Sequence, residues 1–461
     1  MNIKSVIQNI TKKDGETPNS NRKADSAEER IRILLITHRN SDNMGDQMIE
    51  ACNVSLITAV MKNLNKNCQI NSSGSGMISS RYLRSKDSTL LAEAERAIQE
   101  TDVVVFGGAP VFNYLYQNFY ERTAIIIEIA RKYQKPVLFS AIGVESYDES
   151  DPRCQYLKKT LNYDCVKQIT TRDDFEILKK YKVNENLLVG NAADPAVFAG
   201  KIFERFRSEK QQKKIGIFIL RRNGFIDNGI PFTKEESAEL WLDLIRKLEE
   251  HGYDCELLTS GYCEDEAFLE WMIRKYGLNS NKCVFHMDSP EKLVRKISSY
   301  EAVISCRLHP SIVAFALDVP SLGIVWNPKV RGFYRSIGYE DRIFETKQIR
   351  TEEIVLKLEQ AISEGVFKSE PFLMSIYQTL FYGFISALNI ERKNLTPWSY
   401  EKLLEEIPVQ TESSAKTKER RVRKKFRRIY KIYNECLDEK EVLERKVKAL
   451  EIENARLKEK R

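Results

Sequence analysis

The sequence IRILLIT at Ile31–Thr37, followed by NMGD at Asn43–Asp46 and a helical pattern over Gly45–Asn63, decides the fold of this chain. A short apolar, β-branched run of this kind is typical of a strand buried on both faces of a parallel sheet. A helix directly after such a strand begins a strand–helix–strand unit. Repetition of that unit gives a doubly wound α/β domain.

The strand–helix alternation continues to about residue 200 and then restarts. In residues 31–200 we predict strands and helices at Val103–Phe106, Tyr120–Tyr133, Pro136–Ile142, Asp173–Lys180 and Leu187–Val189. The charged residues 201–213 are predicted to be a linker. In residues 214–345 we predict a second α/β domain with elements at Ile215–Leu220, Lys234–Gly252, Asp254–Thr259, Glu264–Tyr276, Val303–Ser305, Pro310–Leu317 and Ser321–Trp326. Ligands in such folds bind at the carboxyl ends of the strands, so we expect the active site between the two domains.

Residues 346–407 are predicted to be closing helices. Within them, Phe372–Ile390 carries no formal charge over 19 residues. Its polar residues recur every three or four positions, which favours an amphipathic helix packed on the body over a membrane span. Residues 1–30 are predicted to be a disordered lead-in. They contain no apolar signal segment, so we expect a cytoplasmic protein.

The composition is that of a globular protein with an unusual tail. Of the 461 residues 42% are hydrophobic, which is enough for two or three domains. Residues 411–461 contain 18 Lys and Arg and 10 Asp and Glu, so they hold the whole excess of the net charge of +7. Nine cysteines form no C-x-x-C pair and there are four histidines, so we expect no metal site.

Residues 416–461 follow a predicted linker at 408–415 and show a heptad repeat. Apolar residues recur every seven positions from Val422, with a second series four residues later from Phe426. This pattern predicts a parallel two-stranded coiled coil and a homodimer. Lys416–Lys431 has a net charge of +9, which suggests peripheral contact with an anionic membrane face. That segment has no Asn or Gln to contact bases, so we expect no nucleic-acid partner.

Chemistry-bearing residues follow the predicted strands. Asn43, Gly45 and Asp46 open the first helix, where exposed N–H groups bind anions or hydroxyls. Helix capping by Asp46 is an equally good reading. Gly107 and Gly108 follow a strand, yet the dinucleotide pattern G-x-G-x-x-G is absent. The adjacent Arg221 and Arg222 are suited to carboxylate or phosphate, although a solvated pair would look the same.

The loop Ser305–Pro310 is the most specific of these. Pro310 is preset for a first helical turn, which places His309 and Arg307 near a helix N-terminus. A guanidinium, an imidazole and a helix dipole together favour an anionic ligand. A buried structural histidine is the alternative. Downstream, Lys329 and Arg331 are further candidate cations.

Taken in order, these motifs resemble a known family. They are Asn43-x-Gly45-Asp46, Val105-Phe106-Gly107-Gly108, Thr171-Arg172-Asp173, Asp194-Pro195-Ala196, Arg307-Leu308-His309 and Lys329-x-Arg331-Gly332-Phe333. Over about Ile31–Ile343 the chain resembles the polysaccharide pyruvyl transferase family. The resemblance implies a GT-B-like fold of two facing Rossmann-like domains. It also implies transfer of a pyruvyl group from phosphoenolpyruvate to a sugar, with the product a pyruvate ketal on a surface polysaccharide or its precursor, which is often lipid-linked.

The resemblance also assigns residues. The donor-binding arginine of the family maps to Arg221, and its Arg-Leu-His element maps to Arg307, Leu308 and His309. We expect His309 to be the acid and Asp46 to accept a hydroxyl proton, with no cofactor or metal required. The substrate-binding candidates are Arg221, Arg222, Arg307, Leu308, Lys329, Arg331, Asn43, Gly45, Gly107, Gly108 and Arg172. The family's third loop glycine is replaced by Ala109-Pro110, which puts the acceptor in question.

A GT-B glycosyltransferase that uses a nucleotide sugar is the alternative function. Such an enzyme needs an acidic side chain to hold the ribose of the nucleotide. Glu264, Asp265 and Glu266 follow a predicted strand of the second domain and are candidates for that role.

Overall fold

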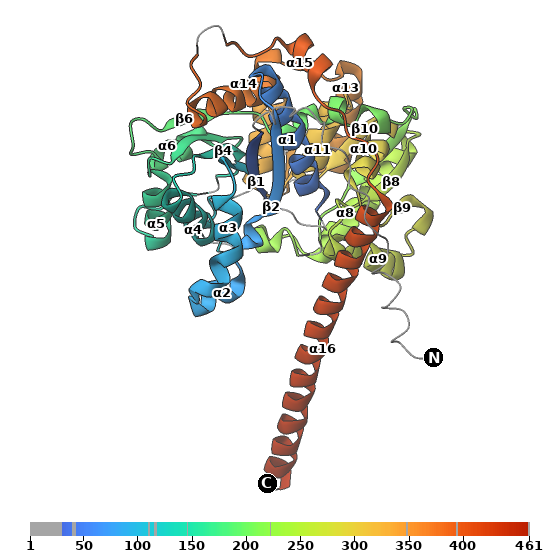
Figure 1. Cartoon of the computed structure of the whole chain (residues 1–461). Helices are drawn as coiled ribbons and strands as arrows, with labels where there is room; N and C mark the ends of the chain where they lie inside the picture. The colour runs from blue at the N-terminus through green and yellow to red at the C-terminus, as the bar shows by residue number, and fades with distance from the viewer. Residues whose placement is uncertain are drawn as a thin grey trace, which may run out of the picture.

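A computed structural model describes residues 30–38, 43–108, 111–114, 118–144, 146–221, 223–346, 349–392 and 395–459 (Figure 1). The predicted lead-in up to Glu29, the candidate Arg222 and the departure at Ala109-Pro110 lie outside these residues.

The first domain is built on a parallel six-stranded sheet in the order β2-β1-β3-β4-β5-β6. Its strands are β1 (Ile31–Thr37), β2 (Cys68–Gly74), β3 (Val103–Gly107), β4 (Val137–Ile142), β5 (Val166–Thr171) and β6 (Leu188–Asn191). Its helices are α1 (Met44–Asn63), α2 (Ser80–Ser85), α3 (Ala92–Gln99), α4 (Phe119–Lys132), α5 (Pro152–Leu161) and α6 (Phe175–Tyr181).

The second domain has a parallel six-stranded sheet in the order β12-β11-β10-β7-β8-β9. Its strands are β7 (Lys214–Phe218), β8 (Asp254–Leu258), β9 (Cys283–Val284), β10 (Ala302–Ser305), β11 (Ser321–Val325) and β12 (Ile343–Glu345). Its helices are α8 (Lys234–Glu250), α9 (Cys263–Tyr276), α10 (Pro290–Ser299), α11 (Leu308–Ala316), α12 (Pro328–Ser336) and α13 (Thr351–Glu364). Short 3₁₀ turns lie at Ser75–Met77, Ser88–Leu91, Pro195–Phe198, Glu204–Phe206, Ile226–Asn228, Ser280–Lys282 and Glu340–Arg342.

Two doubly wound domains are therefore present, which confirms the predicted fold class. The strand order reverses between β1 and β3 in the first sheet, and between β7 and β10 in the second. In doubly wound sheets the crevice for a ligand opens at these reversal points, outside the carboxyl ends of the strands. The residues after β1, β7 and β10 are thus the ones that the topology places in the cleft.

The connection between the domains is packed rather than loose. The stretch predicted as a charged linker contains part of α7 (Ala199–Ile202), and Ile202, Phe203 and Phe206 are all buried. A methyl group added at Gly200 would lie 2.0 Å from the carbonyl oxygen of Ala316 in α11. The apolar residues among these charges fill the space between the domains, which charge counting alone does not reveal.

The chain then returns to the first domain. The uncharged stretch forms the predicted amphipathic helix, α14 (Glu370–Ala387), and is followed by α15 (Tyr400–Glu406). Its Tyr377 hydroxyl accepts a 2.8 Å hydrogen bond from Asn63 Nδ2 of α1, and its Thr379 carbonyl accepts one of 2.9 Å from Gln168 of β5. In the described part of the chain, none of the helices combines the length and the apolar character that a membrane crossing requires.

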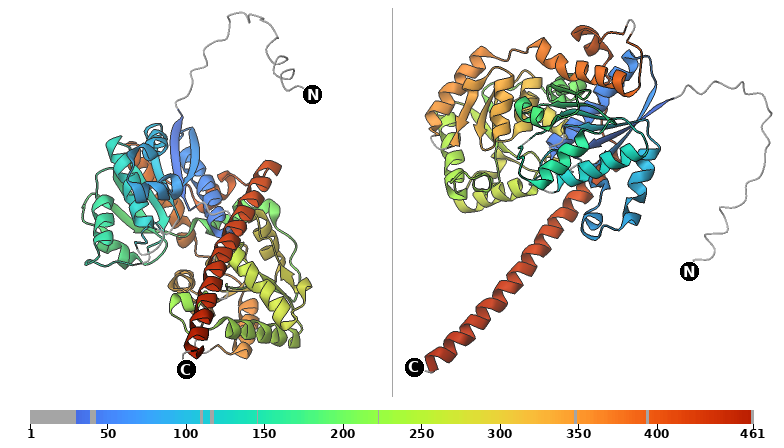
Figure 2. Two further views of the ribbon diagram at one scale, coloured as in Figure 1. Left: turned by 90° about the horizontal axis from the view of Figure 1, so that it is seen from below. Right: turned by 90° about the vertical axis from the view of Figure 1, so that its left-hand side faces the viewer.

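The last helix, α16 (Ala415–Glu459), is 45 residues long and projects from the body (Figures 1 and 2). The predicted linker before it is tied to the body at two points. The N–H of Gln410 donates to the carbonyl of Ile202 at 2.7 Å, and the hydroxyl of Ser413 donates to Glu291 at 2.5 Å.

Candidate active site

A cleft of about 880 Å³ lies between the domains, where the carboxyl ends of both sheets meet. The first domain and α16 contribute His38, Asn43, Asp46, Asn113, Phe119, Arg172 and Arg428. The second domain contributes Arg221, Asp227, Asn228, Ser260, Tyr262, Glu264, Arg307, Leu308, His309, Pro310, Trp326, Asn327, Lys329 and Val330. The topology therefore brings together most of the residues that the sequence singled out.

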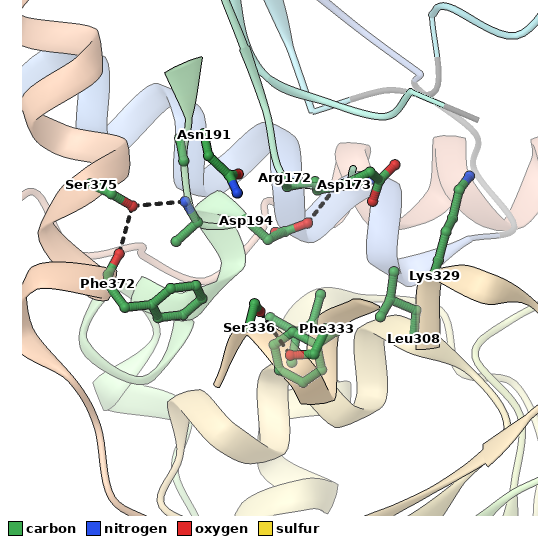
Figure 3. Close-up of a pocket in the computed structure, with 13 residues that line it drawn as sticks. Arg172, Asp173, Asn191, Asp194, Leu308, Lys329, Phe333, Ser336, Phe372 and Ser375 are labelled. Carbon is green, nitrogen blue, oxygen red and sulfur yellow. Dashed lines mark hydrogen bonds and ion pairs between the residues drawn. The ribbon is translucent and has the colours of Figure 1, made fainter. Parts of the chain in front are cut away.

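A smaller pocket of about 270 Å³ adjoins this cleft (Figure 3). The two cavities share Arg172, Leu308 and Lys329. Figure 3 shows the Arg172–Asp194 ion pair in the wall of the pocket, together with Leu308 and Lys329 from the second domain. These shared residues define the junction between the two cavities.

The first turn of α1 presses directly against the second domain. A methyl group added at Gly45 would lie 2.1 Å from Nδ1 of His309 and 2.8 Å from its Cβ. One residue earlier, the N–H of Met44 donates a 3.0 Å hydrogen bond to the carbonyl of Ser260 after β8. Only glycine permits this approach, so the role of Gly45 is to seat the His309 ring.

His309 lies in the first turn of α11, in the position that the sequence predicted. Its Nε2 is buried and has no hydrogen-bond partner among the described residues. Burial lowers the pKa of His309 to about 4, against the opposing effect of the nearby Asp194 carboxylate. In the unliganded protein the imidazole is therefore neutral at pH 7.

Asp46 is the complementary group from the first domain. Its side chain is buried, and within the described residues Oδ2 has no hydrogen-bond partner, with Nε2 of His38 3.9 Å away. Burial raises the pKa of Asp46 to about 7, although the charge of Arg172 opposes the shift. Because Asn43 caps α1 by accepting the N–H of Gly45 at 3.0 Å, Asp46 is not needed as the cap.

Arg172 lies near both Asp46 and His309, and it forms a buried ion pair with Asp194. Its Nε is buried and makes no hydrogen bond to any described residue. Asp194 also accepts the N–H of Ala196 at 2.8 Å, so its position is fixed by the backbone. The guanidinium is held in place by Asp194, and Arg172 itself lines both cavities.

Arg307 lies in the cleft, but its guanidinium is already paired within the protein, whereas the sequence suggested that it binds an anionic ligand. Its guanidinium forms a bidentate ion pair with the buried Asp265, at 2.6 and 2.7 Å from Nη2 and 3.0 Å from Nε. The rings of Tyr262 and Trp326 lie 4.7 and 5.5 Å from it. A second-domain carboxylate 42 residues away thus neutralises the predicted anion-binding arginine.

The other predicted cations differ in position. Lys329, in the first turn of α12, lines both cavities. Arg221 lines the cleft and pairs with Asp227 at 2.8 Å in a partly exposed setting. Arg331 is not among the lining residues. It lies on the half-exposed side of α12 and its Nε donates to Glu345 at 3.2 Å, so the structure does not bring it together with the other candidate residues.

Gly107 and Gly108 serve packing rather than ligand binding. Neither lines either cavity. A methyl group at Gly107 would lie 2.9 Å from Asn53 Nδ2, and one at Gly108 would lie 2.4 Å from Ile49 Cγ2, both in α1. Gly108 also has a φ of +67°, which favours glycine. The structure therefore explains these two glycines by packing, because they let α1 lie close over β3.

Sequence reasoning missed several lining residues. His38 directly follows β1, so its strand-end position was a usable signal. Tyr262 and Trp326 likewise follow β8 and β11, and aromatic side chains at such positions deserve the same scrutiny as charges. Arg428 belongs to α16, and nothing local in the sequence indicates that this helix reaches the cleft.

The acids proposed for a nucleotide ribose are already paired. Glu264 accepts a 2.8 Å bond from Arg428. Glu266 accepts one of 2.7 Å from Lys425 and one of 2.9 Å from the N–H of His286. Asp265 is bound to Arg307. The three candidates therefore have cationic partners from the chain itself.

A model of the family described as polysaccharide pyruvyl transferase matches residues 6–328. The chain belongs to that family. The match begins before the first domain and ends at the start of α12, and thus includes the Asp46 and His309 sides of the cleft. Helix α16 lies outside it. No curated protein matches the chain.

Two solved structures are similar to this chain at low sequence identity. The UDP-GlcNAc 2-epimerase of Methanocaldococcus jannaschii is 14% identical, with 76% of this chain and 98% of that chain covered at a TM-score of 0.50. A heptosyltransferase of E. coli, solved with ADP, is 12% identical over 72% of this chain and 100% of that chain, at a TM-score of 0.38. The first likeness shows that the two domains are arranged as in the GT-B fold.

Proposed function

We propose that this pyruvyl transferase family member moves the pyruvyl group of phosphoenolpyruvate onto two hydroxyls of a saccharide and forms a pyruvate ketal. The observation that carries the proposal is that Asp46 of the first domain and His309 of the second line the same cleft. Asp46 is buried and His309 half-buried, and each has one buried side-chain atom without a hydrogen-bond partner in the described structure. Family membership supports the reaction type.

The donor is placed at the junction of the two cavities. Phosphoenolpyruvate carries a carboxylate and a phosphate, so it requires several donors in one place. The junction offers Lys329 and Arg172. The first turn of α11 adds the backbone N–H groups of Leu308 and His309, because that helix begins in the wall of the cleft. Arg221 is available at the rim for the acceptor or the donor phosphate.

The reaction needs one acid and one base. A proton is added to the methylene carbon of the donor, and the adjacent carbon becomes electrophilic. One sugar hydroxyl adds there and gives up its proton. The bond from that carbon to the phosphate oxygen then breaks, and phosphate leaves with its electron pair. The second hydroxyl adds in its place and its proton is released, so the products are one ketal and one hydrogen phosphate.

The protonation of the unliganded site favours an assignment opposite to the one expected from the sequence. At neutral pH Asp46, with a pKa of about 7, holds a proton for a large part of the time, whereas His309, with a pKa of about 4, does not. A bound trianionic donor raises the pKa of both groups, and Asp46 starts with the higher value, so it is the group that is protonated first at neutral pH. We therefore assign the methylene proton to Asp46 and the acceptance of the hydroxyl proton to Nε2 of His309.

The larger cleft is the place for the acceptor. Its wall combines aromatic rings, Tyr262, Trp326 and Phe119, with polar groups such as Asn113 and Asn228. Flat rings flanked by amides and hydroxyls suit the apolar face and the hydroxyl edge of a sugar. The acceptor is thus a saccharide, free or attached to a lipid carrier that stays outside the cleft.

Incubation with phosphoenolpyruvate and a bacterial-type oligosaccharide, free or lipid-linked, tests the proposal. We expect release of inorganic phosphate and a mass gain of one pyruvyl ketal on the saccharide. Asp46→Asn and His309→Gln should each remove the product, while Asp438→Asn, an exposed acid on α16, should not. Transfer of a sugar from a nucleotide sugar, without reaction of phosphoenolpyruvate, would establish the glycosyltransferase alternative instead.

A further inference from the structure

Helix α16 has two distinct sides. Its first part docks on the second domain, and the remainder extends away from the body into open space (Figures 1 and 2). A helix of 45 residues that leaves the body in this way keeps its apolar side chains in contact with water unless another chain covers them.

The docked side is polar. Arg421 pairs with Glu291 at 3.7 Å, at the start of α10. Lys425 and Arg428 pair with Glu266 and Glu264 at 2.7 and 2.8 Å, in the first turn of α9. The three cations are spaced four and three residues apart, so they lie on one face of α16.

The other side carries the heptad seam. One series is Val422, Ile429, Cys436, Leu443, Leu450 and Leu457, and the second is Phe426, Tyr433, Lys440, Val447 and Asn454. The exposed fractions of the apolar seam residues from Val422 to Leu450 range from 37% for Ile429 to 64% for Leu450. The body therefore leaves the seam open while it holds the cationic face.

The heptad positions show that the two sides do not compete. With the first series at d and the second at a, Arg421 and Arg428 are at c and Lys425 is at g. A partner helix on the a and d seam would leave the contacts of Arg421 and Arg428 at c undisturbed, whereas Lys425 at g lies at the edge of the seam. Docking on the body and pairing with another helix are thus compatible in one chain.

The charges beside the seam select the partner. In a parallel pair, a residue at g faces the residue five positions later on the other helix. Lys446 then faces Glu451, and Glu453 faces Lys458, in both directions. Glu439 facing Glu444 is unfavourable, so the middle of the coil is looser, and the C-terminal end of the seam is the part that is complementary to a second copy of itself in register. Lys440 and Asn454 at a positions favour two strands over larger bundles.

We propose that α16 joins two copies of this chain in a parallel, in-register, two-stranded coiled coil. The two bodies then lie at the same end of the coil, each docked on its own α16 through Arg421, Lys425 and Arg428. Because Arg428 also lines the cleft, the coil begins directly beside each active site.

Sedimentation of the full chain tests the pairing, and two neighbouring residues of α16 provide a matched pair of variants. Leu450 lies on the seam and Ile452 lies two residues later at an outer position, with exposed fractions of 64% and 48%. The wild type and Ile452→Lys should sediment at about twice the chain mass of 53.5 kDa. Leu450→Lys should shift toward the monomer mass at micromolar concentration. A monomeric wild type, or one that forms trimers, overturns the proposal.

Cys436 tests the direction and the register. It lies at a d position, it is exposed, and in a parallel in-register dimer it faces its own copy. Mild oxidation should give a covalent dimer on a non-reducing gel. Cys436→Ser should abolish it, and Cys436→Ser with Asp438→Cys, which moves the thiol to an outer position, should not restore it. A dimer by sedimentation without this cross-link excludes the parallel, in-register arrangement.

Discussion

The buried carboxyl of Asp46 makes the stability of this protein depend on pH, and Asp46→Asn should remove that dependence. Burial raises the pKa of Asp46 from 3.8 in the unfolded chain to about 7 in the folded one. Three units at 1.36 kcal/mol each correspond to about 4 kcal/mol. The figure is an upper bound for a site that relaxes when the carboxyl ionises.

The direction of the pH effect on stability follows from which protonation state of Asp46 the folded protein favours. The folded protein prefers the protonated carboxyl, so the contribution of Asp46 is complete below the unfolded pKa and is lost as pH rises through the folded pKa. Asparagine resembles the protonated carboxyl and does not ionise. The gain in stability of Asp46→Asn over wild type should therefore grow from near zero at about pH 4 to about 4 kcal/mol at about pH 8.

Thermal unfolding of both proteins over this pH range measures the difference. His309 contributes in the opposite direction, because its lowered pKa means that stability is lost as pH falls below 6.5 toward 4. That effect is present in both proteins and cancels in the comparison to first order. Asp438→Asn, which removes an exposed acid, should show no growth with pH.

Asp46→Asn should also lose pyruvyl transfer, so this variant is expected to be more stable than the wild type but inactive. If Asp46→Asn gains no stability between about pH 5 and about pH 8, the carboxyl is not held protonated by the fold. The assignment of Asp46 as the acid would then be wrong, even if Asp46→Asn no longer released phosphate.

Three further predictions concern the cleft and α16. Gly45→Ala inserts a methyl group 2.1 Å from Nδ1 of His309, so turnover should fall by about 100-fold, whereas Gly332→Ala, with no heavy atom within 4 Å, should leave turnover unchanged. Wild-type turnover in Gly45→Ala would mean that the ring position is not critical. Arg428→Ala removes the partner of Glu264 in the cleft wall and should raise KM by up to about fivefold with kcat unchanged, compared with the exposed Arg427→Ala. Equal KM values in the two variants would exclude a role for Arg428 in substrate binding. Vesicles of anionic lipid should retain the protein at low salt and release it at high salt, through the cations of Lys416–Lys431 that face away from the body. Failure of such vesicles to retain it at low salt excludes the membrane contact.

Local signals predicted the strand ends well. Asn43, Asp46 and His309 each lie where an apolar run gives way to a helical pattern, and the structure places all of them in the cleft. Strand β2 was not predicted, because its sequence CQINSSG is polar and only half buried at the sheet edge. Strand β5 was also not predicted, although it lies inside the sheet and is mostly buried, because its sequence VKQITT mixes polar and apolar residues. Runs of apolar residues, rather than burial itself, are what the sequence pattern detects.

Pairing between distant residues could not be predicted. Arg307 looks free in sequence, yet Asp265 neutralises it from a helix 42 residues earlier. Gly107 and Gly108 look like a ligand loop, but the surface they meet is α1, which precedes them by some 45 residues. In each case the partner is set by the order of strands in the sheet, which local patterns do not encode.

The return of α14 to the first domain has a consequence for biosynthesis. Helix α14 covers strands β4 and β5 of the first sheet. It begins 179 residues after β6 ends. At about 5–20 residues per second, the ribosome takes roughly 9–36 s to make that interval. During this time the nascent first domain exposes the side chains of Leu138 and Gln168 that α14 later covers. The last step of its folding thus waits until α14 has been made, and the emerging chain is a natural client for a chaperone.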